Sequence, residues 1–405
     1  MTYKEKREKL EKLNLDLSHY NNSNDICTPM SCVEEMVDAI PEELWNRKNI
    51  KILDPCCGNG NFPVYIETKV KNNYELILND INKVRLEIAK EIITKNVLFY
   101  NKDFFSFIEK KYDLIIANPP FAKFSNGKRA AKNHSLSREF IKHSYILLKE
   151  NGYLVYIIPD NWMSLSDRND LVEILSRQQF IKIDIHGAKK YFPKVGSSFT
   201  WFVWKKTDNK NKTEINNNYL KKEISNVQIK QGIKSLPLFY NEQVKSILDK
   251  TLYSSNKKIK IETSSDLHKY TKKDLLSKER SNEFIYKVWH TQKQLVWSKR
   301  KHKFQDGWKV YISLTSYYST FIDENTGMTQ SIAFVRCKSK EEAEKLKKIL
   351  DHPLYKFINN IHRYGNFNNI RILQLFPYPE NDNDIYKSFN ITSEEVSLIN
   401  EILKI

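Results

Sequence analysis

The chain has 405 residues, too many for one ordinary hydrophobic core, so the length predicts two domains. Lys and Arg number 66 against 49 Asp and Glu, a formal net charge of +17, which favours a polyanionic partner: nucleic acid first, an anionic membrane surface second. No apolar run approaches the ~20 residues of a membrane span and no secretory signal opens the chain. We therefore expect a cytoplasmic protein without a membrane partner, associated with the nucleoid if it binds DNA.

Cysteine usage points to a reducing compartment. The five cysteines are too few and too irregularly spaced for a disulfide framework, and no paired spacing suggests zinc. We expect free thiols and no metal.

The amino-terminal region predicts two helices. Residues 1–20 form a charged pattern with Leu10, Leu13 and Leu17 on one face. Thr28 and Pro29 then predict a helix start, because a hydroxyl cap precedes proline at the first helical position. Apolar residues recur at helical spacing from there until Pro41.

Seven apolar runs alternating with helical patterns follow, which predicts an α/β fold with a doubly wound sheet. The expected strands are residues 50–53, 74–78, 97–100, 112–117, 153–158, 181–185 and 199–204.

A polar, Asn- and Lys-rich stretch from Thr207 to Tyr219 predicts the domain boundary, because such a composition does not bury itself. The predicted domains are residues 1–207 and 208–405, the second mixing short aromatic-rich strands with helices. Residues 251–310 alone hold 15 Lys and Arg against 6 Asp and Glu. This asymmetry favours a DNA-facing module over a second enzyme.

The segment from Asp54 to Phe62 follows a predicted strand directly, where open α/β sheets bind ligands. Gly58 and Gly60 would let the backbone approach a ligand closely. A dinucleotide loop would have a third glycine where this chain has Pro63. The pattern therefore favours a nucleoside with an uncharged linker over a phosphate cradle.

An acidic residue also follows each of the next two predicted strands, at residues 74–78 and 97–100. Asp80 follows Asp54 at about the sequence spacing at which an acid accepts hydrogen bonds from ribose hydroxyls. Asp103 could accept from an adenine amino group while Phe104 lies against the ring. A single strand-end aspartate often caps a helix, but three at successive strand ends favour a cofactor site.

Asn118, Pro119, Pro120 and Phe121 follow the buried run 112–117. An exocyclic amine is a poor nucleophile because its lone pair is delocalised into the ring. The Asn118 side-chain oxygen and the Pro119 carbonyl could accept both amino hydrogens, and consecutive prolines hold these carbonyls extended. Phe121 offers a face for stacking. A simple turn is the alternative, which the position downstream of the cofactor loop makes the weaker one.

Over roughly residues 25–205 these segments resemble the S-adenosylmethionine-dependent methyltransferases of the Rossmann-like class. The segment order resembles the gamma group of restriction-modification DNA methyltransferases, which methylate the adenine amino group and carry a carboxyl-terminal target recognition domain. The resemblance implies a seven-stranded methyltransferase sheet, double-stranded DNA as substrate and S-adenosylhomocysteine as product. The implied cofactor contacts are Thr28, Pro29, Asp54, Pro55, Gly58, Gly60, Asn61, Asp80, Ile81, Asp103, Phe104 and Asn118. Cys56 and Cys57 depart from the small residues usual there, and we assign them to packing.

Residues 191–195 resemble the segment in which such enzymes place an aromatic on the other face of the target base. Phe192 would then form a sandwich with Phe121 around a base flipped out of the duplex. Ordinary core packing is the alternative for Phe192.

Basic and amide side chains outside the catalytic motif are the predicted DNA contacts. One group follows the catalytic motif, one is interleaved with tryptophans, and one surrounds a glycine turn with groups able to read base edges. A polar surface loop is an equal alternative for the last group. The predicted residues are Lys123, Lys128, Arg129, Lys293, Lys299, Arg300, Lys301, Arg363, Asn366, Asn368, Asn369 and Arg371.

We therefore expect a site-specific adenine DNA methyltransferase. Its partner would be a separate cognate restriction endonuclease, or it would act alone. Cytosine-amino methylation is the nearest alternative, although those enzymes more often have Ser at position 118. RNA-base and protein-glutamine methylation use related loops, and an inert DNA-binding protein is a further alternative.

Overall fold

The computed structural model describes residues 1–15, 27–121, 124–125, 128–129, 136–167, 169–193 and 196–405. These residues form two compact units. Unit 1 contains Met1–Met163 and Asp167–Leu236, and unit 2 contains Ser164–Ser166 and Pro237–Ile405. The main division therefore follows Leu236, whereas the sequence placed it after residue 207.

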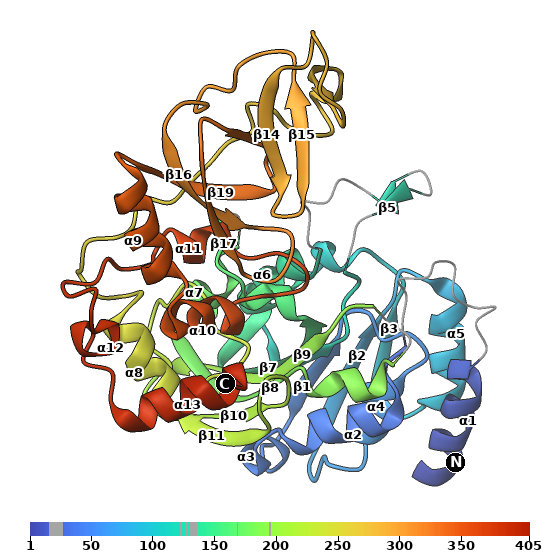
Figure 1. Cartoon of the computed structure of the whole chain (residues 1–405). Helices are drawn as coiled ribbons and strands as arrows, with labels where there is room; N and C mark the ends of the chain where they lie inside the picture. The colour runs from blue at the N-terminus through green and yellow to red at the C-terminus, as the bar shows by residue number, and fades with distance from the viewer. Residues whose placement is uncertain (16–26, 122–123, 126–127, 130–135, 168, 194–195) are drawn as a thin grey trace. The chain divides into compact units, whose positions relative to one another are not determined.

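Unit 1 is built on a nine-stranded sheet with the order β11-β10-β8-β9-β7-β4-β1-β2-β3 (Figure 1). All seven predicted strands are present. They are β1 (Ile50–Asp54), β2 (Tyr74–Asn79), β3 (Val97–Tyr100), β4 (Tyr112–Ala117), β7 (Leu148–Pro159), β8 (Gln178–Ile185) and β9 (Phe199–Asp208). Strands β3, β2, β1, β4 and β7 run parallel, and β9 lies antiparallel between β7 and β8. This is the Rossmann-like methyltransferase sheet that the sequence predicts.

Two further strands extend the sheet: β10 (Thr213–Asn217), which lies within the stretch predicted to be the domain boundary, and β11 (Glu223–Val227), which follows it. Alternate residues of β10 are buried, namely the apolar Ile215 and the polar Thr213 and Asn217. The Thr213 hydroxyl donates to the Phe180 carbonyl at 3.0 Å, so its burial costs little. Composition was misleading here because buried polar groups with partners are tolerated in a strand.

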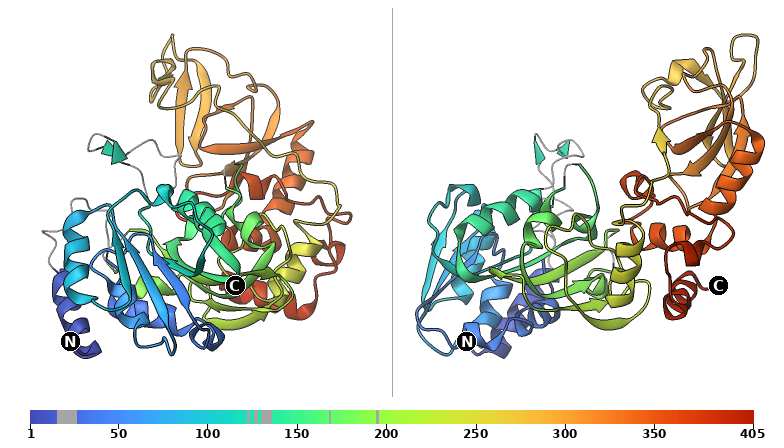
Figure 2. Two further views of the ribbon diagram at one scale, coloured as in Figure 1. Left: turned by 180° about the vertical axis from the view of Figure 1, so that it is seen from behind. Right: turned by 90° about the vertical axis from the view of Figure 1, so that its left-hand side faces the viewer.

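Helices line both faces of this sheet (Figure 2). Side chains of α1, α2, α4 and α5 share one hydrophobic core with alternate residues of the strands, while α6 and α7 contact β7 and β8. The helix bounds are α1 (Tyr3–Leu15), α2 (Met30–Asp38), α3 (Glu42–Trp45), α4 (Asn61–Ile66), α5 (Lys83–Ile92), α6 (Leu136–Leu147) and α7 (Leu171–Leu175), with 3-10 turns η2 (Phe104–Ser106), η3 (Asp160–Met163) and η4 (Gly187–Tyr191). In α1, Leu10 is buried and Leu13 packs on the core as predicted; Leu17 lies outside the described residues.

Unit 2 mixes strands and helices, as predicted for the carboxyl-terminal half. One sheet has the order β12-β19-β16-β17 and the other β13-β15-β14-β18. The strands are β12 (Glu262–Thr263), β13 (Leu276–Ser277), β14 (Tyr286–Thr291), β15 (Gln294–Ser298), β16 (Trp308–Ser313), β17 (Thr320–Glu324), β18 (Gly327–Met328) and β19 (Ile332–Cys337). The helical elements are α8 (Glu242–Lys250), η5 (Lys273–Leu275), α9 (Lys340–Leu350), α10 (Pro353–Ile361), α11 (Ile370–Leu373), α12 (Ile385–Ser388) and α13 (Ser393–Leu403).

No helix among the described residues has the length and apolarity needed to cross a membrane. All five cysteines are free thiols.

Phe202 tests the core of unit 1. Its ring is fully buried, with ring centroids 5.2 Å from Trp162 and 5.6 Å from Phe180. Phe202→Ala should lower the free energy of unfolding by about 3–5 kcal/mol, because it leaves a cavity. Ile224→Ala in β11, where the side chain is 70% exposed, should change it by less than about 0.5 kcal/mol. Urea unfolding followed by circular dichroism compares the two; equal losses would contradict this account of the core.

Asp184, near the carboxyl end of β8, makes stability pH-dependent. Burial and the charge of Glu35 raise its pKa to about 6, against the opposing effect of Lys190. The folded protein then keeps this proton while the unfolded chain loses it, so stability falls as pH rises from about 4 to about 6. Asp184→Asn should match the wild type below pH 4 and exceed it by about 3 kcal/mol at pH 8. Urea unfolding across this pH range measures the difference, and parallel curves would contradict it.

Candidate active site

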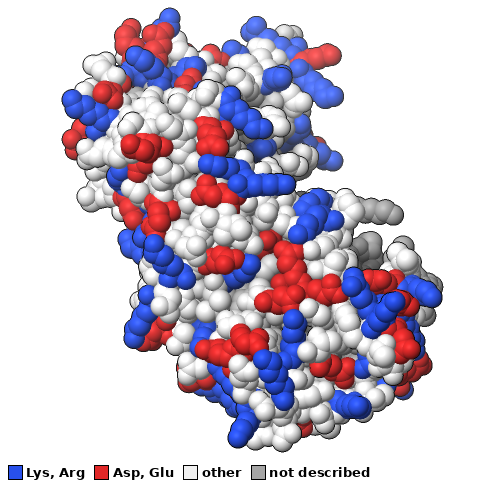
Figure 3. Space-filling view, turned by 90° about the horizontal axis from the view of Figure 1, so that it is seen from below, with Lys and Arg blue, Asp and Glu red and all other residues white. Residues whose placement is uncertain are grey.

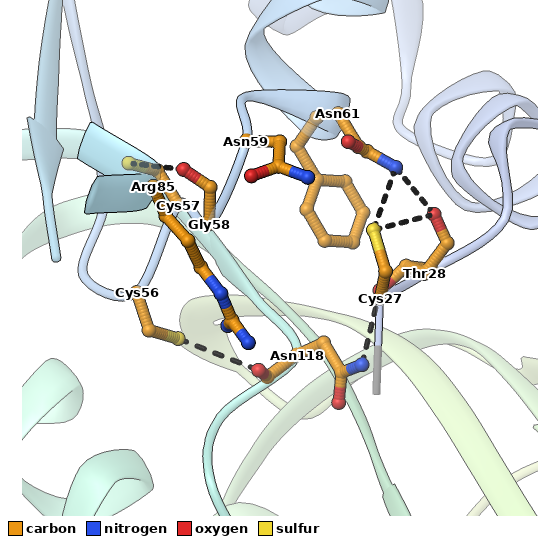
Figure 4. Close-up of a pocket in the computed structure, with 10 residues that line it drawn as sticks. Cys27, Thr28, Cys56, Cys57, Gly58, Asn59, Asn61, Arg85 and Asn118 are labelled. Carbon is orange, nitrogen blue, oxygen red and sulfur yellow. Dashed lines mark hydrogen bonds between the residues drawn. The ribbon is translucent and has the colours of Figure 1, made fainter. Parts of the chain in front are cut away.

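The predicted catalytic and cofactor segments meet because β1 and β4 are neighbours in the sheet. Leu53 pairs with Ile115 in parallel, so both strands deliver their following loops to the same sheet edge. A pocket lies there (Figure 4). Its lining residues are Cys27, Thr28, Cys56, Cys57, Gly58, Asn59, Asn61, Phe62, Arg85 and Asn118.

The loop after β1 turns sharply at its two glycines. Gly58 has φ +54° and Gly60 has φ +95°, conformations that other residues rarely adopt. The Gly58 amide donates to the Asp80 carboxylate at 2.8 Å. Asp80 therefore holds the loop against the end of β2, while a second oxygen accepts from the Asn82 amide at 2.7 Å.

Hydrogen bonds join the three segments that the sequence singled out. The Asn118 amide nitrogen donates to the Thr28 hydroxyl at 3.0 Å, and the Asn61 amide donates to the Thr28 carbonyl at 2.8 Å. The Cys56 thiol donates to the Asn118 main-chain carbonyl at 3.4 Å. Because the Asn118 nitrogen faces Thr28, its side-chain oxygen points away from Thr28.

This use of Thr28 differs from the predicted helix cap. Pro29 occupies the cap position before α2, and no side chain bonds the first turn there. The Thr28 hydroxyl is instead engaged by Asn118.

Asp54 and the loop that follows it to line the pocket carry buried acceptors. Asp54 is 1% exposed, and both its burial and the nearby charge of Asp80 raise its pKa well above the usual range. One Asp54 carboxylate oxygen and the side-chain oxygens of Asn59 and Asn61 are buried without a hydrogen-bond partner among the described residues. Such a set is suited to a ligand that brings hydrogen-bond donors.

The sequence missed Arg85 and Asn59, which line the pocket. Arg85 is 7% exposed and lies in the first turn of α5, three residues after its cap Asn82. Its position in the first helical turn after the strand-end acid Asp80 is the sequence signal that could have identified it. Cys56 was assigned to packing, but its thiol bonds the catalytic loop.

The adenine contacts predicted after β3 are only partly compatible with the structure. Asp103 is exposed and caps η2 by accepting from the Phe105 amide. Phe104 is 3% exposed, with ring centroids 4.8 Å from Phe140 and 4.9 Å from His143. The prediction that Phe104 stacks on a ligand is therefore wrong here, because the aromatic cluster occupies its faces. Ile81, beside Asp80, is 78% exposed and offers an apolar surface instead.

The predicted sandwich between Phe121 and Phe192 is also absent. Phe192 is 5% exposed within the core, and its ring centroid lies 5.1 Å from that of Phe199. Phe121 packs on the same residue at 5.3 Å. Phe192 is thus a core residue, whereas Phe121 is half-buried at the end of the catalytic motif.

Several predicted DNA contacts form ion pairs on unit 2. Lys299 pairs with Glu283, Arg300 with Asp266, and Lys301 with Asp306. Lys293 is exposed in the turn between β14 and β15. Lys123 lies outside the described residues, and Lys128 and Arg129 form the short strand β6, paired with β5 (Phe124–Ser125).

The predicted glycine turn of unit 2 contains two structural asparagines. Asn368 is 4% exposed, and its side chain bonds backbone carbonyls at 2.7 and 3.1 Å. Asn369 caps α11 and donates to the Leu165 carbonyl. The prediction that these two amides read bases is therefore wrong, because both hold the backbone. Asn366 is exposed, Arg371 bonds Gln374, and Arg363 stacks on an aromatic ring.

Residues 9–192 match the family model described as Eco57I restriction-modification methylase. The chain is 29% identical over 224 residues to the type II methyltransferase M.HincII of Haemophilus influenzae. The predicted resemblance to restriction-modification methyltransferases is confirmed. This match covers 51% of the chain and 40% of M.HincII, so the chain spans less than half of that relative's length.

Two other similarities are narrower or weaker. Ribosomal RNA small subunit methyltransferase C of Haemophilus influenzae is 40% identical over 79 residues, which is 19% of this chain and 24% of that protein. The crystal structure of the type IIG restriction endonuclease BpuSI aligns with 98% of this chain and 63% of its own, at 12% identity and a TM-score of 0.45. These values are too low for a functional comparison.

The two loop glycines provide a matched test of the pocket's shape. A methyl group at Gly60 would lie 2.7 Å from the Ile93 side chain, whereas at Gly58 nothing lies within 4 Å among the described residues. Gly58→Ala should cost about 1 kcal/mol of unfolding free energy for its left-handed conformation alone. Gly60→Ala should cost about 2–3 kcal/mol because steric overlap is added. Urea unfolding of both variants checks the order, and a greater loss for Gly58→Ala would contradict it.

Proposed function

We propose that this chain is a site-specific DNA methyltransferase that transfers a methyl group from S-adenosylmethionine to the exocyclic amino group of a flipped-out adenine. The observation that carries the proposal is the bond from the Asn118 amide to Thr28, which turns the Asn118 oxygen away from Thr28 beside a pocket of buried acceptors. Unit 1 would perform catalysis, and unit 2 would recognise the target sequence.

The pocket residues fit S-adenosylmethionine by their chemistry. Buried carboxyl and amide oxygens of Asp54, Asn59 and Asn61 would accept from ligand N–H and O–H groups, and Asp80 would accept from ribose hydroxyls. The cofactor, when bound, supplies an electrophilic methyl group on a sulfonium. The proposed contacts are Thr28, Pro29, Asp54, Pro55, Gly58, Asn59, Gly60, Asn61, Asp80, Ile81, Arg85, Asp103 and Asn118.

Asn118 and Pro119 would activate the target amine. The side-chain oxygen of Asn118 and the carbonyl of Pro119 would each accept one amino hydrogen, which shifts the nitrogen lone pair out of conjugation. Pro119 and Pro120 have no N–H, so neither can satisfy a neighbouring carbonyl. Cys56 restrains the Asn118 carbonyl and Thr28 restrains its amide, so the acceptors are positioned before the base arrives. Phe121 would stack on the base. The methylated nitrogen carries a positive charge, so its extra proton is acidic and would pass to solvent water, and no general base is required.

Adenine is preferred over cytosine because position 118 is Asn, where enzymes acting on the cytosine amino group more often have Ser. The large basic carboxyl-terminal half supports DNA over a protein substrate. The similarity to an RNA enzyme covers only 79 residues, 19% of this chain, and so gives little support to an RNA substrate.

Double-stranded DNA is the proposed partner, together with a separate cognate restriction endonuclease. The net charge of +17 supports a polyanion. Basic and acidic side chains are interspersed over the face in Figure 3, so that face is not a uniform basic surface. Lys123, Lys128, Arg129, Lys293, Asn366 and Arg371 remain proposed DNA contacts, with Lys299, Arg300 and Lys301 exchanging their present ion pairs for phosphates.

Modified-base sequencing tests the activity, using DNA from a host that lacks its own methylases and expresses the whole chain. We expect N6-methyladenine in one short motif. Asn118→Ala should reduce the methylation rate by roughly 10²- to 10³-fold, as expected when one hydrogen bond to the transition state is removed. Thr28→Val should reduce it by about tenfold, because Asn118 loses its restraint.

Calorimetric titration with S-adenosylmethionine is the control for these variants, since the Asn118→Ala protein should lose one of the proposed cofactor contacts and still bind the cofactor through the others. Methylated cytosine would correct the target base. Unmodified DNA together with methylated RNA or protein would overturn the DNA assignment, and failure of the wild type to bind S-adenosylmethionine would overturn the whole proposal.

A further inference from the structure

Two surface loops of unit 2 carry strongly exposed aromatic rings. Tyr317, in the loop between β16 and β17, is 83% exposed, and Phe367, in the loop between α10 and α11, is 65% exposed. Leaving large rings in water forgoes the free energy of burying them. Two such rings on adjoining loops therefore mark an interaction surface rather than packing.

A single buried amide joins these loops. The Asn368 side chain donates to the carbonyls of Ser313 and Ser316 at 2.7 and 3.1 Å, and its oxygen accepts from Asn359 at 3.0 Å. Its backbone amide also donates to the Leu314 carbonyl at 2.9 Å. The side-chain nitrogen therefore holds the two loops together, while the side-chain oxygen ties Asn368 to helix α10 through Asn359.

The hydrogen bonds of Asn368 fix the backbone next to each ring. Tyr317 directly follows Ser316, whose carbonyl Asn368 holds, and Phe367 directly precedes Asn368. The next residue, Tyr318, is anchored through its hydroxyl to the Leu350 carbonyl at 3.0 Å. The exposed rings are therefore mounted on restrained backbone, which lowers the entropy cost of binding.

The surroundings of the rings identify the partner. The Arg363 guanidinium lies over the Tyr317 ring, 4.9 Å from its centroid. Gly365, with φ +92°, allows the sharp turn between Arg363 and Phe367. Aromatic faces beside a guanidinium, on a chain of charge +17, match the chemistry of nucleobase stacking supported by a phosphate contact.

We propose that Tyr317 and Phe367 stack on nucleobases of the DNA substrate that become unstacked where the target base leaves the duplex, with Arg363 contacting a phosphate beside them. This inference rests on the proposed function and adds the element of unit 2 that contacts the bases. Asn368 is a positioning residue in this arrangement, since it touches both loops rather than the DNA.

The test measures binding of a duplex that contains the motif methylated by the wild type, using fluorescence anisotropy. Tyr317→Ala and Phe367→Ala should each raise Kd by roughly 5- to 150-fold, the range expected for loss of one stacked base. Tyr317→Phe and Phe367→Tyr keep the ring and should bind within about twofold of the wild type. Tyr270→Ala is the matched control, because that ring is 71% exposed in unit 2 but belongs to neither loop.

Salt dependence separates stacking from charge. The two ring variants should keep the wild-type slope of log Kd against log salt, whereas Arg363→Ala should lower it by about one. Heparin, which has charge but no bases, should bind the ring variants and the wild type equally.

The outcomes distinguish this inference from the function on which it rests. If the wild type methylates the motif while both ring-removing variants bind it normally, the inference is overturned and the proposed function stands. Equal weakening of heparin and duplex binding would also overturn stacking. If the wild type neither binds nor methylates DNA, both are overturned.

Discussion

The parallel pairing of β1 with β4 is the constraint on which the site depends. The register of Leu53 opposite Ile115 brings two loops, distant in the chain, to one sheet edge. Neither loop could form the pocket alone, because one supplies buried acceptors and the other supplies Asn118. The Thr28 hydroxyl then ties a third segment to them through Asn118.

The pocket combines rigidity with unmet hydrogen-bonding capacity. Left-handed glycines, the Asp80 carboxylate and the Cys56 thiol hold its backbone in place, while several buried oxygens lack partners among the described residues. Burial of such groups is unfavourable without a ligand. The folded state tolerates this unfavourable free energy at the pocket, where a ligand rich in hydrogen-bond donors is expected to bind. Functional sites in many proteins show the same feature.

Unit 2 uses asparagine in a comparable way. The Asn368 side-chain nitrogen donates to backbone carbonyls of the facing loop and its oxygen accepts from Asn359, while the two loops leave their aromatic rings in solvent. In both units, therefore, buried polar side chains fix the geometry of segments whose neighbouring groups remain available for binding.

The sequence alone determined the seven core strands, the two loops at their carboxyl ends and the resemblance to restriction-modification methyltransferases, because hydrophobic periodicity and glycine and proline positions are local properties. It did not reveal that β10 pairs with β8, that Phe104 and Phe192 are core, or that Asn368 is buried. Each of these depends on which surface covers a side chain. That is decided by contacts between residues far apart in the chain, so an exposed aromatic such as Tyr317 and a buried one such as Phe192 became distinguishable only in the tertiary structure.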